Sequence, residues 1–196
     1  MKPRRVLFWL HLAAGATAGS VVLIMAGTGV LLAAQTPVLA FAERSLRVAP
    51  PSPGAPRLDL DALVERARAA APGAEPDGAL LHSDPSAPVA VSFGRERTVF
   101  LNPYDGSVLG EGASGLRRFF QRTEEWHRWL AASGNRRPAG RAVTGACNAA
   151  FFFLALSGPF LWWPRRWTRT ALRASLLPSL KGRGKARDWN WHNAVG

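Results

Sequence analysis

The feature that most constrains this chain is an apolar stretch over residues 6–34, which contains no formally charged side chain. A helix of about 20 apolar residues is long enough to cross the hydrocarbon core of a bilayer. The competing interpretation is a signal peptide cleaved near Ala40 and Ala42, but the apolar core of such a peptide is only about 7–15 residues long. Because this stretch is far longer, we predict that residues 6–34 form a transmembrane helix.

A second apolar stretch predicts a transmembrane helix over residues 139–163, with a kink expected at Gly158-Pro159. Tryptophans and arginines follow directly, as is typical where a helix leaves the bilayer for the cytoplasm. Residues 189–196 again combine tryptophans with small residues, and we expect them to begin a third helix that is truncated at the chain end. So short a segment cannot cross a bilayer by itself.

Basic residues give the chain a formal net charge of +12 and are concentrated in two flanks, residues 1–5 and residues 164–188. Positive flanks mark the cytoplasmic ends of membrane helices. We therefore expect a multi-pass protein of the bacterial inner membrane, surrounded by membrane lipid, with a cytoplasmic N-terminus and residues 35–138 in the periplasm. A charge excess divided between two flanks does not form a basic patch on one folded surface, which excludes nucleic acid as the expected partner.

Between the two apolar stretches, the residue pattern predicts a small α+β domain. Residues 35–56 are expected to form a linker, because prolines crowd their second half. Residues 57–111 are expected to form one helix, with Asp59 as its N-cap, packed on an antiparallel sheet. The predicted strands are residues 89–93, 98–101 and 107–109. The predicted fold class is thus membrane α-helical with an extracytoplasmic α+β domain, followed by an amphipathic interfacial segment over residues 116–138.

In combination, these features resemble the PepSY-associated transmembrane family over nearly the whole chain. Three segments carry the resemblance. They are the closing strands around Asn-Pro-Tyr-Asp-Gly (residues 101–110), the motif His-Arg-Trp-Leu (residues 127–130), and the helix end Ser-Gly-Pro-Phe-Leu-Trp-Trp-Pro-Arg-Arg (residues 157–166). His192 stands where the family has a histidine at the start of a further helix. The chain departs from the family where its first helix opens His11-Leu12, since that position often reads His-Arg-Trp-Leu-Gly, and in lacking the later helices.

The resemblance implies electron transfer, because members of the family include reductases that act on ferric siderophores in the periplasm. It makes His11, His127 and His192 candidate axial ligands of haem b. A ferric siderophore and an unidentified electron donor are then the expected partners. His11 and His192 both follow a cytoplasmic flank, so we expect them at similar depth and bound to one haem. No residue is assigned a catalytic role, and haem iron is the only metal expected.

His11 lies inside the first predicted helix, where a polar side chain is costly and usually marks function. Gly15 and Gly19 follow on the same face of the helix. They would leave a groove beside the imidazole in which a flat porphyrin could lie. The alternative is that both glycines form a small-residue contact with a neighbouring helix, with His11 hydrogen-bonded across it.

The remaining polar candidates have simpler interpretations. His127 and His192 stand near tryptophans and could each be interfacial side chains. His82 precedes a turn, and no second His or Cys lies near it in sequence to complete a zinc site. Glu124 and Glu125 are adjacent and therefore point in different directions on a helix, which argues against a paired-carboxylate site.

Two further classes of function stay open. PepSY domains resemble the propeptide regions of some metalloproteases, so the chain could be a membrane-tethered regulatory module that binds or inhibits proteins without redox activity. It could also be a structural subunit whose helices complete a partner. A haem spectrum would separate both alternatives from an electron carrier.

Overall fold

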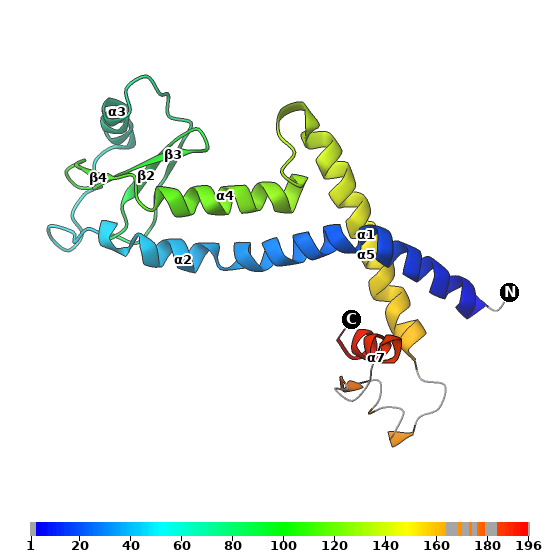
Figure 1. The fold of residues 1–196 in the computed structure, drawn as a ribbon. Coiled ribbons are helices and arrows are strands. Elements are labelled where there is room, and N and C mark those ends of the chain that lie inside the picture. Colours follow the sequence, from blue (N-terminus) through cyan, green and yellow to red (C-terminus); the bar gives the residue numbers. More distant parts are fainter. Residues whose placement is uncertain (1–2, 164–167, 170–172, 174–175, 179–183, 196) are drawn as a thin grey trace. The chain divides into compact units, whose positions relative to one another are not determined.

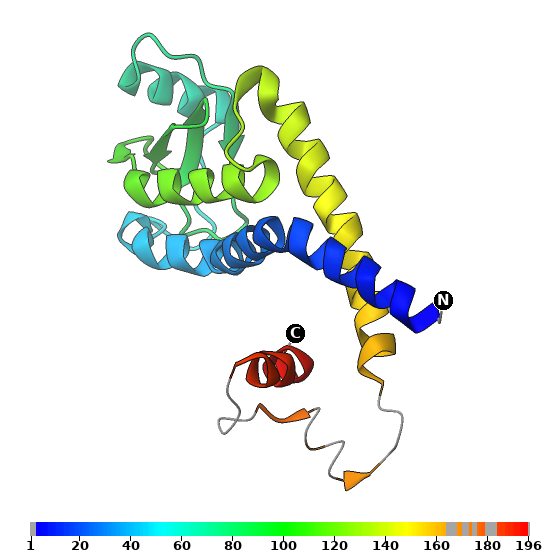
Figure 2. The same ribbon diagram turned by 45° about the vertical axis from the view of Figure 1, so that its right-hand side comes forward.

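The structure, a computed structural model, describes residues 3–163, 168–169, 173, 176–178 and 184–195 (Figure 1). The chain divides into two compact units, and each is described by itself. One unit consists of residues 1–23 together with residues 142–196, and the other consists of residues 24–141. Figure 2 shows the same elements from a second direction.

Two helices of the described chain are long and apolar enough to cross a membrane, α1 (Pro3–Ala33) and α5 (Arg137–Trp162). Their side chains are mostly exposed, since only 6% of the most apolar window of the first helix and 11% of that of the second are buried. An apolar helix in the core of a soluble protein would instead be largely buried, because exposing apolar surface to water costs about 25 cal/mol per Å². The exposure therefore fits helices that are surrounded by lipid.

The bounds of these helices lie close to the predicted ones, 6–34 and 139–163. Pro159 lies in the last turn of α5, where it removes one backbone hydrogen bond from the helix. The helix continues past it to Trp162. A shorter helix, α7 (Lys185–Val195), starts a few residues before the predicted start at residue 189.

The predicted linker over residues 35–56 is wrong in its first part. After a turn, the chain forms a second helix, α2 (Gln35–Ala42), and then a 3-10 turn, η1 (Arg44–Leu46). Pro37 is compatible with α2 because it lies in the first turn, where backbone N–H groups have no partner within the helix. Residues 47–59 are irregular, as their prolines require.

The described part of the second unit contains a four-stranded antiparallel sheet with the strand order β1-β2-β3-β4. Its strands are β1 (Gly78–Leu80), β2 (Val89–Phe93), β3 (Arg97–Leu101) and β4 (Val108–Gly110). Helix α3 (Leu60–Ala70) lies across one face of this sheet (Figure 1). Alternate residues of a strand share a face, so Val91 of β2 and Leu101 of β3 pack with Leu63 of α3 in a core that excludes water.

This domain has the predicted α+β class. Asp59 caps α3 as expected, because its carboxylate accepts a hydrogen bond from the backbone N–H of Asp61 at 3.3 Å. Strand β1 was not predicted. Its residues, Gly-Ala-Leu, include no β-branched or aromatic side chain, and it forms by pairing with β2, where Gly78 lies opposite Ser92.

Helix α4 (Ser114–Trp129) follows β4 and runs alongside α2 in both views (Figure 1 and Figure 2). Trp129 is 6% exposed, and its indole lies 4.6 Å from the guanidinium carbon of Arg137. Gly140 is required beside it, because a Cβ atom there would lie 2.4 Å from the carbonyl oxygen of Trp129. The predicted interfacial segment, residues 116–138, therefore consists of most of α4, a tight loop and the start of α5.

Candidate functional site

His11 is held across the contact between α1 and α5. Its Nδ1 atom lies 2.7 Å from the hydroxyl oxygen of Ser157, and that hydroxyl lies 2.7 Å from the carbonyl oxygen of Phe153, one turn earlier in α5. Ser157 is 4% exposed, so water has little access to this hydrogen bond. The neighbouring Gly158 lies against the same ring, and a Cβ atom there would be 3.7 Å from His11 Cε1.

The two glycines expected to form a groove beside His11 differ from each other. A Cβ atom at Gly15 would lie 3.8 Å from the side chain of Leu154 in α5, which is an ordinary packing distance. A Cβ atom at Gly19 would meet nothing within 4 Å. Gly15 thus belongs to the contact between the two helices, whereas the space beside Gly19 is open.

His192, on α7, is the second histidine of this unit. Its ring centroid lies 6.3 Å from that of His11, and the planes of the two rings are inclined at 69°. Trp189 of the same helix stacks on Phe8 of α1, with 5.7 Å between the centroids. Two aromatic side chains of α1 therefore contact α7, and both contacts lie near the start of α1.

The distance between the two histidine rings can be compared with the distance expected for two imidazoles that bind one metal ion. Two imidazoles on opposite sides of one metal ion have centroids about 6 Å apart, because each metal–nitrogen bond is about 2 Å long and the ring centre lies about 1 Å further on. The 6.3 Å between the ring centroids of His11 and His192 is close to this separation. No cluster of three or more His, Cys, Asp or Glu residues that could hold a bare metal ion occurs among the described residues.

His127, on α4, contacts the second half of α1 and belongs to the other unit. Its Nδ1 atom lies 3.0 Å from the carbonyl oxygen of Met25 and 3.0 Å from the hydroxyl oxygen of Thr28. A Cβ atom at Gly29 would lie 3.3 Å from His127 Cε1, which is a tight contact. In the described part of the chain, no ring contact joins His127 to another histidine.

The adjacent glutamates of α4 and the turn at His82 in the α+β domain each have contacts that stabilise the fold. Glu124 pairs with Arg128 at 2.8 Å, one turn later in α4. Arg95 lies between the two glutamates, 4.0 Å from Glu124 and 3.6 Å from Glu125. The backbone carbonyl of His82 accepts a hydrogen bond of 2.6 Å from the guanidinium of Arg57, which holds its turn in place.

The turn after His82 contains a strongly acidic carboxyl group. The backbone N–H and the hydroxyl of Ser86 donate to Asp84 at 2.9 Å and 2.8 Å, and the guanidinium of Arg47 donates to the same side chain. These hydrogen bonds lower the pKa of Asp84 to about 2, because they favour its ionised form. This cluster lies at the surface, with the side chain of Asp84 45% exposed, and it stabilises the turn.

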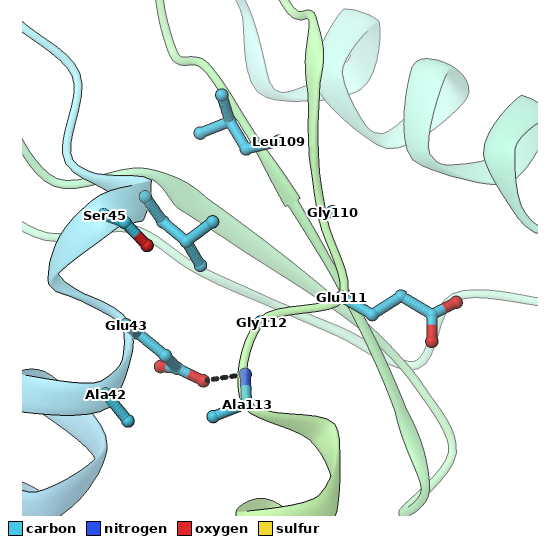
Figure 3. Close-up of a pocket in the computed structure, with 9 residues that line it drawn as sticks. Ala42, Glu43, Ser45, Leu109, Gly110, Glu111, Gly112 and Ala113 are labelled. Atoms are coloured by element: carbon cyan, nitrogen blue, oxygen red, sulfur yellow. Dashed lines mark hydrogen bonds between the residues drawn. The ribbon is translucent and has the colours of Figure 1, made fainter.

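A polar cavity of about 340 Å³ lies between η1 and the segment that joins β4 to α4 (Figure 3). Glu43 lines it and is largely buried. One carboxylate oxygen accepts the backbone N–H of Ala113 at 3.2 Å, and the pair of oxygens binds the guanidinium of Arg117 at 2.6 Å each. Sequence reasoning missed Glu43 because it lies in the predicted linker. Its hydrogen bonds join α2 to the first turn of α4.

Sequence reasoning also missed the hydroxyl and glycine partners of the histidines. The signal that could have found them is a Ser-Gly or Thr-Gly pair inside an apolar helix. Three such pairs occur, Thr28-Gly29, Thr144-Gly145 and Ser157-Gly158, and the first and the last contact histidines. Hydroxyl side chains in a membrane helix are available to bond a polar group of a neighbouring helix. Which polar group they bond depends on how the helices pack, and a single sequence does not contain that information.

Comparison with known proteins identifies a family. The family model described as the PepSY-associated TM region matches residues 8–196. A search of curated proteins finds no significant match to the chain. The match covers both apolar helices and the α+β domain between them, which together indicate a membrane protein. The chain belongs to the family of proteins that carry the PepSY-associated TM region.

Proposed function

We propose that this protein is a haem-binding electron-transfer protein of the bacterial inner membrane. The observation that carries the proposal is the 6.3 Å separation of His11 and His192, which suits two axial ligands of one iron. Haem b, when bound, would supply reversible one-electron chemistry. Two histidine ligands would leave no open position for oxygen on that iron, which favours electron transfer over oxygen chemistry.

The orientation in the membrane is part of the proposal. Arg4, at the start of α1, donates to the carbonyl oxygens of Leu161 and Trp163 at 2.5 Å and 3.1 Å. The beginning of α1 and the end of α5 therefore lie on the same side of the membrane in this account. Both are basic flanks, so this side is cytoplasmic. The α+β domain, between the two helices in sequence, is then periplasmic.

His127 is proposed as a ligand of a second haem, near the periplasmic side. It follows the α+β domain in the chain and contacts α1 at Met25 and Thr28, beyond the middle of that helix. Electrons would pass from the cytoplasmic side to this haem. The proposed acceptor is the ferric ion of a siderophore, which takes up one electron and leaves as the ferrous ion. The electron donor is a separate component on the cytoplasmic side.

One observation favours a second function, that of a protein-binding module. β1 is an edge strand whose residues are all exposed. The apolar side chains of Leu80, at its end, and of Leu81, which follows it, are 56% and 44% exposed. An exposed edge can add a strand from a partner by backbone hydrogen bonding. A regulatory or protease-binding role without redox activity would use this edge.

The experiment that tests the proposed function is a reduced-minus-oxidised visible spectrum of the protein purified in detergent from cells supplied with haem. The proposal predicts the bands of a low-spin b-type haem. The matched control is His82→Ala, which removes a histidine of the α+β domain and should leave the spectrum unchanged. A purified protein without haem bands would contradict the proposal and would favour the protein-binding module.

A further inference from the structure

We infer that Ser157 is a positioning residue for the imidazole of His11, and that Thr28 acts in the same way on His127 together with the backbone carbonyl of Met25. Each ring is thereby held in the tautomer with the proton on Nδ1. The Nε2 atom then keeps its lone pair and is the atom able to bind iron. The role of Nε2 as an iron ligand rests on the proposed function. The tautomer itself does not, because it is a property of the protein before any cofactor binds.

The tautomer of His127 follows from its carbonyl partner. A carbonyl oxygen accepts hydrogen bonds and never donates them. Because the oxygen of Met25 lies 3.0 Å from Nδ1, the ring nitrogen must carry the proton of that bond. The hydroxyl of Thr28 donates to the carbonyl oxygen of Ile24 at 2.6 Å, so it too accepts from Nδ1. In a neutral imidazole, Nε2 is then unprotonated.

The tautomer of His11 follows from the hydroxyl of Ser157. This hydroxyl has one hydrogen, and the carbonyl oxygen of Phe153, at 2.7 Å, can only accept it. With the hydroxyl hydrogen on that carbonyl, the contact of Ser157 with His11 Nδ1, also at 2.7 Å, takes the proton of the ring. Ser157 is buried, so water does not replace it as a partner.

The two sites share a local pattern although they belong to different units. In each, a hydroxyl residue followed by glycine lies on the neighbouring helix, and the pairs are Ser157-Gly158 and Thr28-Gly29. The hydroxyl meets Nδ1, and the glycine lies against Cε1 of the same ring. The Nδ1–Cε1 edge of each ring is thereby occupied by protein. Metal-binding histidines commonly donate their second ring nitrogen to a hydrogen-bond acceptor in this way.

The test uses haem-free protein labelled with ¹⁵N at histidine and reconstituted in lipid. Nitrogen NMR shifts distinguish protonated from unprotonated ring nitrogens, and His11→Ala and His127→Ala assign the signals. We expect both histidines as Nδ1–H tautomers, whereas free histidine prefers the proton on Nε2. Ser157→Ala should move His11 toward the Nε2–H form and leave His127 unchanged, and Ser157→Thr should retain the original form.

Thr17→Ala is the matched control, because Thr17 also donates to a carbonyl oxygen one turn earlier in its helix, at 2.8 Å, but is hydrogen-bonded to no histidine among the described residues. It should change neither tautomer. Finding the Nε2–H form of His11 in the unsubstituted protein, or no shift in Ser157→Ala, would overturn the inference.

A second measurement separates this inference from the proposed function. In haem-loaded protein, Ser157→Ala should weaken haem retention by about 10-fold, since loss of such a partner typically costs 10–100-fold in metal affinity. Nδ1–H tautomers in a protein that binds no haem would support the positioning role and refute the proposed function. If the protein binds haem through His11 but the tautomer of His11 does not change in Ser157→Ala, the proposed function would be supported and the positioning role refuted.

Discussion

The two histidine sites of this protein share a local pattern, but the two rings differ in their hydrogen-bond partners. His127 donates to a backbone carbonyl as well as to a hydroxyl, whereas His11 donates to the hydroxyl of Ser157. His11 in turn has His192 at 6.3 Å, and His127 has no comparable ring neighbour in the described residues. The comparison teaches that a backbone partner fixes a ring regardless of side-chain changes, while a side-chain partner makes the ring sensitive to a single substitution.

The largest effect is expected from removing the rings themselves. His11→Ala and His127→Ala should each remove one of two haems, so that each lowers the haem content per protein by about half. Haem content is measured by extraction of the purified variants, with His82→Ala as the control that should lose none. If one substitution removed all of the haem and the other removed none, the two sites would not be independent.

The next effect comes from removing the hydroxyl partners, and we expect a larger loss of haem affinity at His11 than at His127. Ser157→Ala should weaken haem binding by about 10-fold, because it leaves the Nδ1–H of His11 without a partner. Thr28→Ala should weaken it by less than about 3-fold, because the carbonyl of Met25 still accepts from His127. Haem titration of both variants gives the comparison. Equal losses would show that the backbone carbonyl does not hold the ring.

A smaller difference is expected between the two glycines. Replacing a helical glycine by alanine usually stabilises a helix by about 0.5–1 kcal/mol. Gly158→Ala should retain part of that gain, because its new Cβ would lie 3.7 Å from His11 but would be crowded by the ring of Pro159. In Gly29→Ala the Cβ would lie 3.3 Å from His127, and the shift of that ring should offset the gain. Thermal unfolding in one detergent measures both, and a larger gain for Gly29→Ala would contradict the stated contacts.

The smallest effect lies outside both sites, in the turn of the α+β domain. The pKa of Asp84 is lowered from 3.8 to about 2, so its ionised form stabilises the folded state. This contribution is fully present above pH 3.8 and is lost as the pH falls toward 2. Asp84→Asn should remove that part of the acid dependence of unfolding and leave the haem spectrum unchanged. An unaltered acid profile in Asp84→Asn would show that other carboxyl groups cause the loss.

Much of the fold could be predicted from the sequence, because apolar length and strand alternation are local properties. The positions of α1 and α5 followed from two long apolar stretches, and the N-cap of α3 followed from Asp59. Strand β1 and the helix in the predicted linker were missed. In both, tertiary pairing or the tolerance of a first-turn proline outweighed the propensity of the residues.

The candidate site could be predicted only in part. The three histidines were selected by resemblance, and the closeness of His11 and His192 was expected from their cytoplasmic flanks. Their partners were not expected, because Ser157 and Thr28 are distant in sequence from the rings that they contact. The glycine expected to open a groove, Gly15, packs against Leu154, whereas Gly29 and Gly158 are the glycines that lie against imidazoles.

The most direct test of the account is low-temperature electron paramagnetic resonance of the oxidised, haem-loaded protein. His11→Ala and His192→Ala should each abolish the same low-spin signal and produce a high-spin one, and the double substitution should add little, since both residues would bind one iron. His127→Ala should leave that signal intact. If His11→Ala and His192→Ala instead abolished different signals, the two histidines would not share a haem and the central claim would be wrong.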